Sequence, residues 1–378
     1  MLPFDRLVVE QDAADSATAE RLMRQARDRG IEVMLRPAGG GDTLPDALGR
    51  SKRVLRVTRH VGAVLRPCTG RTDSLLCCNL RVLTQVVGCP LDCSYCILQT
   101  YQNRSEITIR VDPHPILDQL ALELQVQPRR LMRVCTGQVA DSLALEPLAG
   151  LAVPAVERFA ALPNAVLELK TKTDAVEPLL PLVHQGRTIV SFSLNPHRVV
   201  QQEEHRTASL QRRMQAARRV ADVGYLLAFH LDPMVTLDGD PTLHVELVRE
   251  LARMVPVDRV AYISMGTVRF HPAMRRVVGG RFGASIVTQA ELLPDVDGKL
   301  RLLSPVRVEL YRQVARVVRR CFPEAYLYLC MEPPRVWRQA LGVQLASRRE
   351  LELDFARSLH HRFGLAPVEP RLPDYLED

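Results

Sequence analysis

The sequence is poor in aromatic residues and contains no long hydrophobic run. Aromatic side chains make up 5% of the 378 residues and Trp337 is the one tryptophan, so the core is expected to rest on Leu, Val and Ala. No apolar run reaches the roughly 18 residues that a membrane-spanning helix needs. The first residues also lack the basic and apolar regions of a signal peptide. These absences predict a cytoplasmic protein with no membrane partner.

Positive charge, mostly as arginine, is what the chain has in excess. The formal net charge is +7. Guanidinium groups bind phosphate oxygens in pairs, so this charge balance is compatible with a nucleic-acid partner, although charge alone does not establish one. The hydrophobic fraction of 47% and the charged fraction of 25% are ordinary for a globular protein.

The chain divides into three parts by pattern. Residues 1–80 are predicted to form an N-terminal extension, 81–340 alternate short apolar strands with amphipathic helices, and 341–378 form a helical tail. Strand and helix alternation predicts a parallel sheet with helical crossovers. The fold class is therefore α/β, a partial, TIM-like (β/α)6 barrel followed by a C-terminal α/β segment. The six expected strands cover 81–87, 130–136, 165–172, 188–194, 226–232 and 260–266.

Polar residues follow these strands where each one ends. In a barrel of this kind the chemistry belongs at the carboxyl ends of the strands, so residues from several strands are expected to face one rim. The residues in question are a three-cysteine loop after the first strand, Gln138 and Asp141 after the second, Lys172 after the third, Asn195 after the fourth and Asp232 after the fifth.

The three-cysteine loop, GCPLDCSYCILQT, carries Cys89, Cys93 and Cys96. Thiols stay reduced in the cytoplasm, where clustered cysteines favour metal binding over disulfides. Three thiolates can bind three irons of a 4Fe-4S cluster, which leaves the fourth iron open to a reacting molecule. That arrangement is typical of enzymes in which S-adenosyl-L-methionine binds the open iron and yields a 5′-deoxyadenosyl radical. A zinc site is the alternative, but it usually needs a second cysteine pair or a histidine nearby.

Further segments extend the pattern beyond the cysteines. LELKTKTDAVEPLL, SFSLN and RMQAARRVADVGYLLAFHLDPM resemble, in order and approximate spacing, segments of the spore photoproduct lyases and of the wider lyase-like group of radical S-adenosylmethionine (radical SAM) enzymes. The resemblance runs from about residue 80 to 270, and more faintly to 340. It implies a radical SAM barrel, DNA with a thymine–thymine lesion as the substrate, and an electron donor such as flavodoxin or ferredoxin.

The resemblance also assigns roles to single residues. Cys89, Cys93 and Cys96 fall at the cluster ligands, Tyr95 at a hydrogen-relay tyrosine and Cys135 at the hydrogen-donor cysteine. The residues expected beside S-adenosylmethionine are Lys172, Ser193, Asn195 and Gln138, the last where the wider group often carries a glutamate. Each has a plainer alternative: Cys135 as a buried apolar side chain, Tyr95 as a packing residue, Lys172 as a solvated strand end and Asn195 as a loop cap.

Two departures from the family pattern leave the substrate open. Ile97 stands where the family has a second relay tyrosine, and the segment after Cys135 is about two residues longer. A radical SAM enzyme acting on RNA, a peptide or a small molecule is therefore the second hypothesis. An iron–sulfur protein that senses nucleic acid without catalysis is the third.

The remaining chemistry-bearing residues receive simpler interpretations. Lys170 is expected to lay its stem along apolar surface with its ammonium in solvent. Cys77, Cys78, Cys321 and Cys330 are expected to pack in the core. The candidates for phosphate contacts are Arg269, His271, Arg275 and Arg276, which follow a barrel strand closely. The oligomeric state is not predicted.

Overall fold

The computed structural model describes residues 4–39, 52–72, 74–101, 106–236, 240 and 242–375. Its main element is an eight-stranded sheet in the order β18-β14-β13-β11-β10-β9-β5-β4. All neighbours in this sheet run parallel except β4, which pairs antiparallel with β5. The strands are β4 (Leu65–Pro67), β5 (Arg81–Leu83), β9 (Met132–Cys135), β10 (Ala165–Thr171), β11 (Thr188–Ser193), β13 (Leu226–Met234), β14 (Val260–Thr267) and β18 (Tyr326–Leu329).

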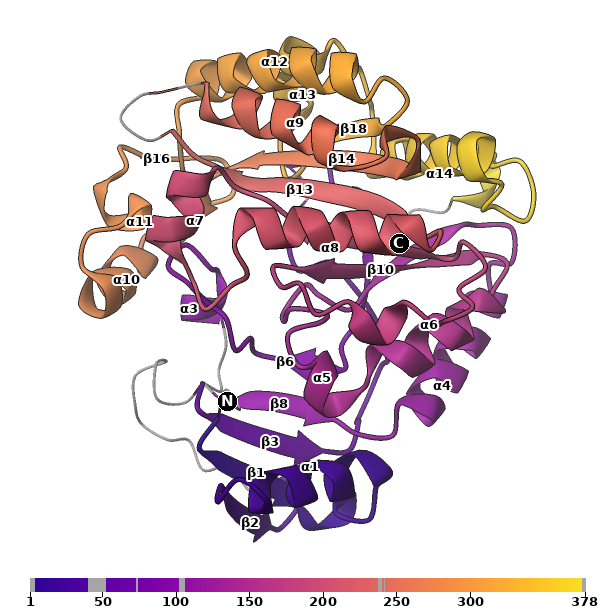
Figure 1. Ribbon diagram of the computed structural model, residues 1–378. Helices are drawn as coiled ribbons and strands as arrows, with labels where there is room; N and C mark the ends of the chain where they lie inside the picture. Colours follow the sequence, from indigo (N-terminus) through magenta and orange to yellow (C-terminus); the bar gives the residue numbers. More distant parts are fainter. Residues whose placement is uncertain are drawn as a thin grey trace.

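The curled sheet confirms the predicted partial barrel. Helices cover its outer face, as Figure 1 shows. All six expected strands are present, although the first is shorter, since 86–87 leave to join another sheet. The strand predicted for the C-terminal segment joins the barrel as β18 beside β14. The helices are α4 (Pro113–Gln125), α6 (Ala152–Ala160), α8 (Leu210–Asp222), α9 (Leu243–Met254), α12 (Ser304–Cys321), α13 (Pro334–Leu341) and α14 (Arg348–Phe363).

Helix α8 illustrates why these segments fold as they do. The Ser209 side chain accepts a hydrogen bond from the Arg212 backbone, which satisfies one free N–H of the first turn. Leu210, Met214 and Ala217 repeat at helical spacing and are buried against the sheet. Gly224, at a φ of +95°, follows the helix end in a conformation that favours glycine. The sequence SLQRRMQAARRVADVG predicts this helix, with Thr207 or Ser209 as its N-cap and Gly224 as its C-cap. The helix and the Ser209 N-cap are confirmed, whereas the C-cap is Val223, one residue before Gly224.

A second, smaller sheet lies beside the barrel (Figure 1). Its order is β2-β1-β3-β8-β6, and it is covered by α1 (Ala17–Arg27). Two of its strands come from beyond residue 80, so the N-terminal part of the chain is completed by segments that flank the cysteine loop. The strands are β1 (Arg6–Glu10), β2 (Glu32–Arg36), β3 (Val54–Thr58), β6 (Val86–Val87) and β8 (Ile107–Arg110).

The interior of the barrel below its mouth is filled with charged and aromatic side chains. Glu168 of β10 is fully buried and accepts hydrogen bonds from Ser191 at 3.0 Å and from His230 at 2.7 Å. The Arg133 guanidinium lies 4.2 Å from the centre of the Phe355 ring and 5.1 Å from that of Tyr262. The barrel is therefore a packed core, and ligands have access only at its rim. No helix among the described residues is both long and apolar enough to cross a membrane.

Two buried histidines predict a loss of stability in mild acid. Burial lowers the pKa of both His230 and His244 to about 4, from 6.5. Between these values the unfolded chain binds protons that the folded chain does not, so the unfolding free energy falls as the pH drops from 6.5 towards 4. Each histidine should cost about 2 kcal/mol between pH 6.5 and 5.

The measurement is urea unfolding at pH 6.5 and 5.0, followed by the fluorescence of the buried Trp337. In a His244→Gln variant the difference between the two pH values should shrink by about 2 kcal/mol. An unchanged difference would contradict the assignment of a neutral His244.

Candidate active site at the barrel mouth

The cysteine loop connects β6 to α3 (Leu98–Tyr101) at the mouth of the barrel. It starts at Gly88, whose φ of +90° favours glycine and whose N–H donates to the Val139 carbonyl at 2.9 Å. A Cβ at Gly88 would lie 3.1 Å from the Ile107 Cα, so the loop passes too close to β8 for a side chain. This glycine holds the loop between the two sheets.

The three cysteines occupy a setting that suits a metal cluster. Cys93 is buried, whereas Cys89 and Cys96 are half-buried and reach solvent. Burial, with the neighbouring Asp141 carboxylate and Cys96, raises the pKa of the Cys89 thiol. Burial also raises the pKa of Cys93, so both thiols would lose their protons only on binding a metal.

The chemistry of the donor set can be compared with that of a 4Fe-4S cluster. No group of three or more His, Cys, Asp or Glu side chains within the described ranges is placed to hold one metal ion. A cubane has no such requirement, because each cysteine binds a different iron. The donor set, three cysteines on one partly exposed loop, therefore fits a 4Fe-4S cluster.

Two adjacent glutamates anchor the loop to the barrel. The two-residue strand β7 (Asp92–Cys93) pairs antiparallel with β12 (Glu204–His205), which follows α7 (His197–Glu203). The Ser94 hydroxyl donates to Glu203 and the Tyr95 hydroxyl donates to Glu204. Glu204 also forms a fully buried ion pair with Arg213 of α8 at 2.5 Å. Lys172 and Arg213 outweigh the effect of burial and lower the pKa of Glu204, which is therefore ionised.

A second set of contacts holds the loop to two segments that are distant from it in the sequence. The Lys52 ammonium donates to the Leu91 carbonyl at 2.6 Å and to Asp92 at 2.8 Å. Arg281 of α10 (Met274–Phe282) donates to both oxygens of Asp92, at 3.1 and 3.0 Å. Sequence reasoning missed Lys52, Asp92, Glu203, Glu204, Arg213 and Arg281. The one local signal was the pair of consecutive glutamates at 203 and 204, at the end of an apolar helical segment.

Three of the predicted site residues meet beside the cysteine loop. The Lys172 ammonium lies 5.8 Å from the centre of the Tyr95 ring. Asn195 is fully buried and donates to Glu204 at 2.9 Å and to the Tyr95 hydroxyl at 3.3 Å. Its Oδ1 atom has no hydrogen-bond partner among the described residues. Lys172, Tyr95 and Asn195 thus form one wall of the mouth.

Cys135 and Gln138 lie on the neighbouring strand and the loop that follows it. Cys135 ends β9 at 1% exposure, and its sulfur accepts the Gly137 N–H at 3.2 Å. Burial raises the pKa of this thiol. The Gln138 amide donates to Cys68 and to Thr69, at 2.9 Å each, and lines a cavity of about 690 Å³ between the two sheets. The structure therefore places Gln138 on a different wall from Lys172.

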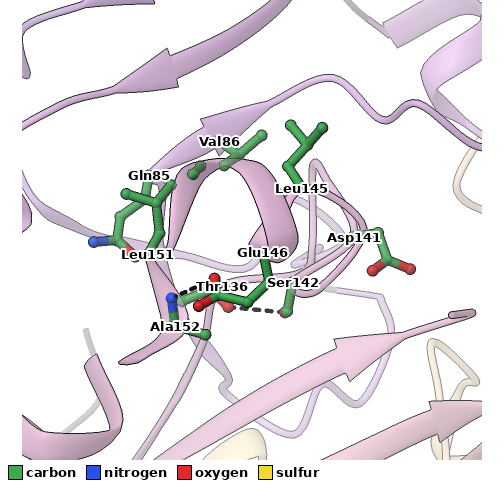
Figure 2. Close-up of a pocket in the computed structure, with 10 residues that line it drawn as sticks. Gln85, Val86, Thr136, Asp141, Ser142, Leu145, Glu146, Leu151 and Ala152 are labelled. Carbon is green, nitrogen blue, oxygen red and sulfur yellow. Dashed lines mark hydrogen bonds between the residues drawn. The ribbon is translucent and has the colours of Figure 1, made fainter. Parts of the chain in front are cut away.

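Asp141 shapes the loop after β9. It accepts hydrogen bonds from the Thr171 hydroxyl at 2.8 Å and the Lys172 N–H at 2.7 Å. Figure 2 shows Asp141 beside the loop where Thr136 donates to Ser142 at 2.8 Å. The cavity drawn there has a volume of about 20 Å³, which is enough for about one water and too small for a cofactor. Asp141 is thus a positioning residue for the end of β10.

Ser193, the last of the residues expected beside S-adenosylmethionine, ends β11 and is 2% exposed. Its carbonyl accepts a hydrogen bond from Arg213 at 2.9 Å, so the same guanidinium holds both β11 and Glu204.

The four candidates for phosphate contacts do not form one surface. Arg269 turns into the barrel mouth and donates to both oxygens of Asp232, at 2.9 and 3.0 Å. Arg275 donates to the Ala290 carbonyl at 2.7 Å. His271 and Arg276 are exposed. Arg269 thus lies apart from the exposed His271 and Arg276, because its guanidinium is paired with the half-buried Asp232 carboxylate.

Two other expectations also change. Cys78 does more than pack, because its sulfur accepts a hydrogen bond from the Arg133 guanidinium at 2.6 Å. A hydrogen bond from Cys77 and the same guanidinium lower the pKa of Cys78 to about 6. Lys170 does not face the outer surface, because it lies two residues after the fully buried Glu168 and so shares the inward face of β10. The carboxylates of Asp232 and Glu168 accordingly raise its pKa.

Comparison with known proteins gives consistent matches. A family model described as "Spore photoproduct lyase" matches residues 5–291. The spore photoproduct lyase of Geobacillus sp. (strain Y412MC61) is 30% identical over 198 residues, which cover 52% of this chain and 58% of that protein. The enzyme of the same name from Clostridium acetobutylicum is 24% identical over 255 residues, which cover 65% of this chain and 73% of that protein. The match to the first of these relatives therefore spans less than two thirds of its length.

Solved structures share the fold. A cysteine-to-alanine variant of spore photoproduct lyase superimposes with a TM-score of 0.75 at 24% identity, covering 86% of this chain and 98% of that one. A related double variant, described with bound AdoMet and dinucleoside spore photoproduct, gives a TM-score of 0.73 at 23% identity, covering 87% and 99%.

Proposed function

Because this chain belongs to the spore photoproduct lyase family, we propose that it is a cytoplasmic radical SAM enzyme that reverses a thymine–thymine lesion in damaged DNA. The observation that carries the proposal is the pairing of a three-cysteine loop with a buried thiol, Cys135, at the mouth of one partial barrel. A solved relative is described with bound AdoMet and dinucleoside spore photoproduct, the two ligands that this function requires.

Cys89, Cys93 and Cys96 would hold a 4Fe-4S cluster. When bound together with S-adenosylmethionine, the cluster supplies the electron that releases a 5′-deoxyadenosyl radical, and a donor such as flavodoxin or ferredoxin restores that electron. The Lys172 ammonium is suited to pair with the methionine carboxylate, and the Gln138 amide to accept from the methionine amine. Ser193 and Asn195 lie at and just after the end of β11, the strand next to β10.

Cys135 is suited to return a hydrogen atom to the substrate. Its raised pKa keeps the S–H bond intact at neutral pH, and its 1% exposure shields the thiol from solvent. Tyr95 is the relay candidate, and its hydroxyl is held by Glu204. The exposed His271 and Arg276 are suited to DNA phosphates, together with Arg275, while Arg269 would act through Asp232.

The test uses reconstituted, reduced protein under anaerobic conditions. It is mixed with S-adenosylmethionine and an oligonucleotide that carries spore photoproduct, and the digest is analysed by chromatography and mass spectrometry. We expect restored thymines and 5′-deoxyadenosine. Both should be absent in Cys89→Ala and retained in Cys321→Ala, whose cysteine lies at the end of α12 away from the mouth. Unchanged lesion alongside 5′-deoxyadenosine would overturn the proposed substrate.

Cys135→Ala separates the hydrogen donor from the rest of the site. This variant should still make 5′-deoxyadenosine, because no cluster ligand is removed. Its yield of restored thymine should fall at least about tenfold, with side products in place of thymine. A thymine yield equal to that of the unmodified protein would show that Cys135 only packs.

A further inference from the structure

Lysine is rare in this chain, and two of its lysines share one strand. Of the 50 lysines and arginines, four are lysines: Lys52, Lys170, Lys172 and Lys299. Lys52 and Lys299 are ion-paired with Asp92 and Asp297, at 2.8 and 3.2 Å. The other two lie two residues apart, Lys170 in β10 and Lys172 directly after its last residue, and alternate residues of an extended chain face the same side. Lys170 therefore faces the barrel interior with Glu168 below it and Lys172 above.

The ammonium of Lys170 is charged and has unused donors. Burial alone would lower its pKa, but the carboxylates of Asp232 and Glu168 outweigh burial and raise it. The ammonium makes no hydrogen bond or close ion pair with the residues that the structure describes. Both carboxylates are committed to other partners, Asp232 to Arg269 and Glu168 to His230 and Ser191.

Lys170 is also linked through Gly137 to the Cys135 thiol. The register of β9 and β10 pairs Cys135 with Glu168, which precedes Lys170 by two residues in β10. The Gly137 N–H donates to the Cys135 sulfur at 3.2 Å. A Cβ at Gly137 would lie 3.0 Å from the Lys170 Cβ and 2.7 Å from its carbonyl oxygen, so only glycine lets the loop after β9 approach β10 this closely. The ammonium and the thiol therefore belong to the same small region of the mouth.

A half-buried ammonium with unfilled donors is costly unless another group completes its hydrogen bonds. On the proposed function, the Cys135 thiol must reach a carbon of the lesion base. A hydrogen-bond donor in the same region, such as the Lys170 ammonium, would then contact the base and not the phosphate backbone.

We propose that Lys170 is a substrate-binding residue whose ammonium donates a hydrogen bond to a carbonyl oxygen of the pyrimidine base that Cys135 approaches. Asp232 keeps the ammonium over the mouth, and Arg269 in turn holds Asp232. The assignment rests on the proposed function and adds to it the contact by which this chain recognises the base.

The experiment measures two dissociation constants on the cluster-loaded protein. One is for dinucleoside spore photoproduct, which carries the bases without a DNA duplex, and the other is for S-adenosylmethionine. In Lys170→Met the lesion should bind about tenfold to a hundredfold more weakly, the effect of losing a hydrogen bond from a charged donor. S-adenosylmethionine should bind within about twofold of the unmodified protein, because no predicted cofactor contact is changed.

Two further variants sharpen the result. Lys170→Gln keeps a neutral donor and should recover part of the lesion affinity, and it also serves if Lys170→Met folds poorly. Lys172→Met should show the opposite pattern, with weaker S-adenosylmethionine binding and a smaller effect on the lesion. Trp337 emission checks the fold of each variant.

The outcomes separate this assignment from the proposed function. If the unmodified protein binds and repairs the lesion and Lys170→Met binds it equally well, the assignment is overturned alone. The assignment is also overturned alone if Lys170→Met no longer binds S-adenosylmethionine but still binds the lesion with unchanged affinity. An unmodified protein that neither binds nor repairs the lesion overturns the proposed function, and the assignment falls with it.

Discussion

A Cys96→Ala protein is expected to carry almost no iron–sulfur cluster and to release no detectable 5′-deoxyadenosine. Removing a residue that only supports a metal ligand typically costs 10- to 100-fold in affinity, so the loss of a ligand should cost at least about 100-fold. Cys96 suits this test because, unlike Cys93, it is half-buried and does not take part in the β7–β12 pairing. Iron content, visible absorption and nucleoside release are the three measurements.

Cys321→Ala is the matched control. Cys321 is also half-buried, but it ends α12 and the proposal gives it no role. It should retain cluster and turnover, so that any loss in Cys96→Ala reflects ligation and not the removal of a thiol as such. Full cluster loading in Cys96→Ala would refute the assignment of the loop as the cluster site.

An Arg213→Met protein is expected to lose about 3–5 kcal/mol of unfolding free energy, the usual result of leaving a buried charge without its partner. Both members of the Arg213–Glu204 pair are fully buried at 2.5 Å. Arg213 also donates to the Ser193 and Ala208 carbonyls, at 2.9 Å each, so its loss would loosen β11 as well. Cluster loading should fall too, because Glu204 holds Tyr95 and pairs with Cys93.

Urea unfolding followed by Trp337 fluorescence measures the stability change, and iron content measures the loading. The control is Arg218→Met on the same helix, where an exposed ion pair with Asp222 contributes little. That variant should change the unfolding free energy by no more than about 0.5 kcal/mol. Equal effects of the two substitutions would mean that the buried pair does not anchor the cysteine loop.

The barrel shows how much a local pattern predicts. Short apolar runs located the six strands, and helical spacing between two capping residues located α8. Both signals arise from neighbours within a few residues along the chain. The three cysteines likewise lie within one short loop, so their spacing predicted a metal cluster without knowledge of the fold. Strand β8 was missed although Ile107, Ile109 and Val111 alternate, because its four residues are at the lower limit of length over which alternation is informative.

The anchors of the site had no such local signal. Asp92 meets Lys52 and Arg281, which are 40 residues before it and 189 residues after it. Glu204 meets Tyr95 across 109 residues. An ion pair between distant segments leaves no periodicity, so only the folded chain reveals it.

Lys170 and Lys172 mark the limit of the sequence most clearly. By itself the sequence determined that both residues end one strand, that a cysteine loop precedes that strand and that the sheet is parallel. The tertiary structure decided that their common face is the inward one, because the curl of the sheet and the Asp232–Arg269 pair surround them. Which side of a strand is enclosed depends on how the sheet closes, and closure is a property of all its strands together.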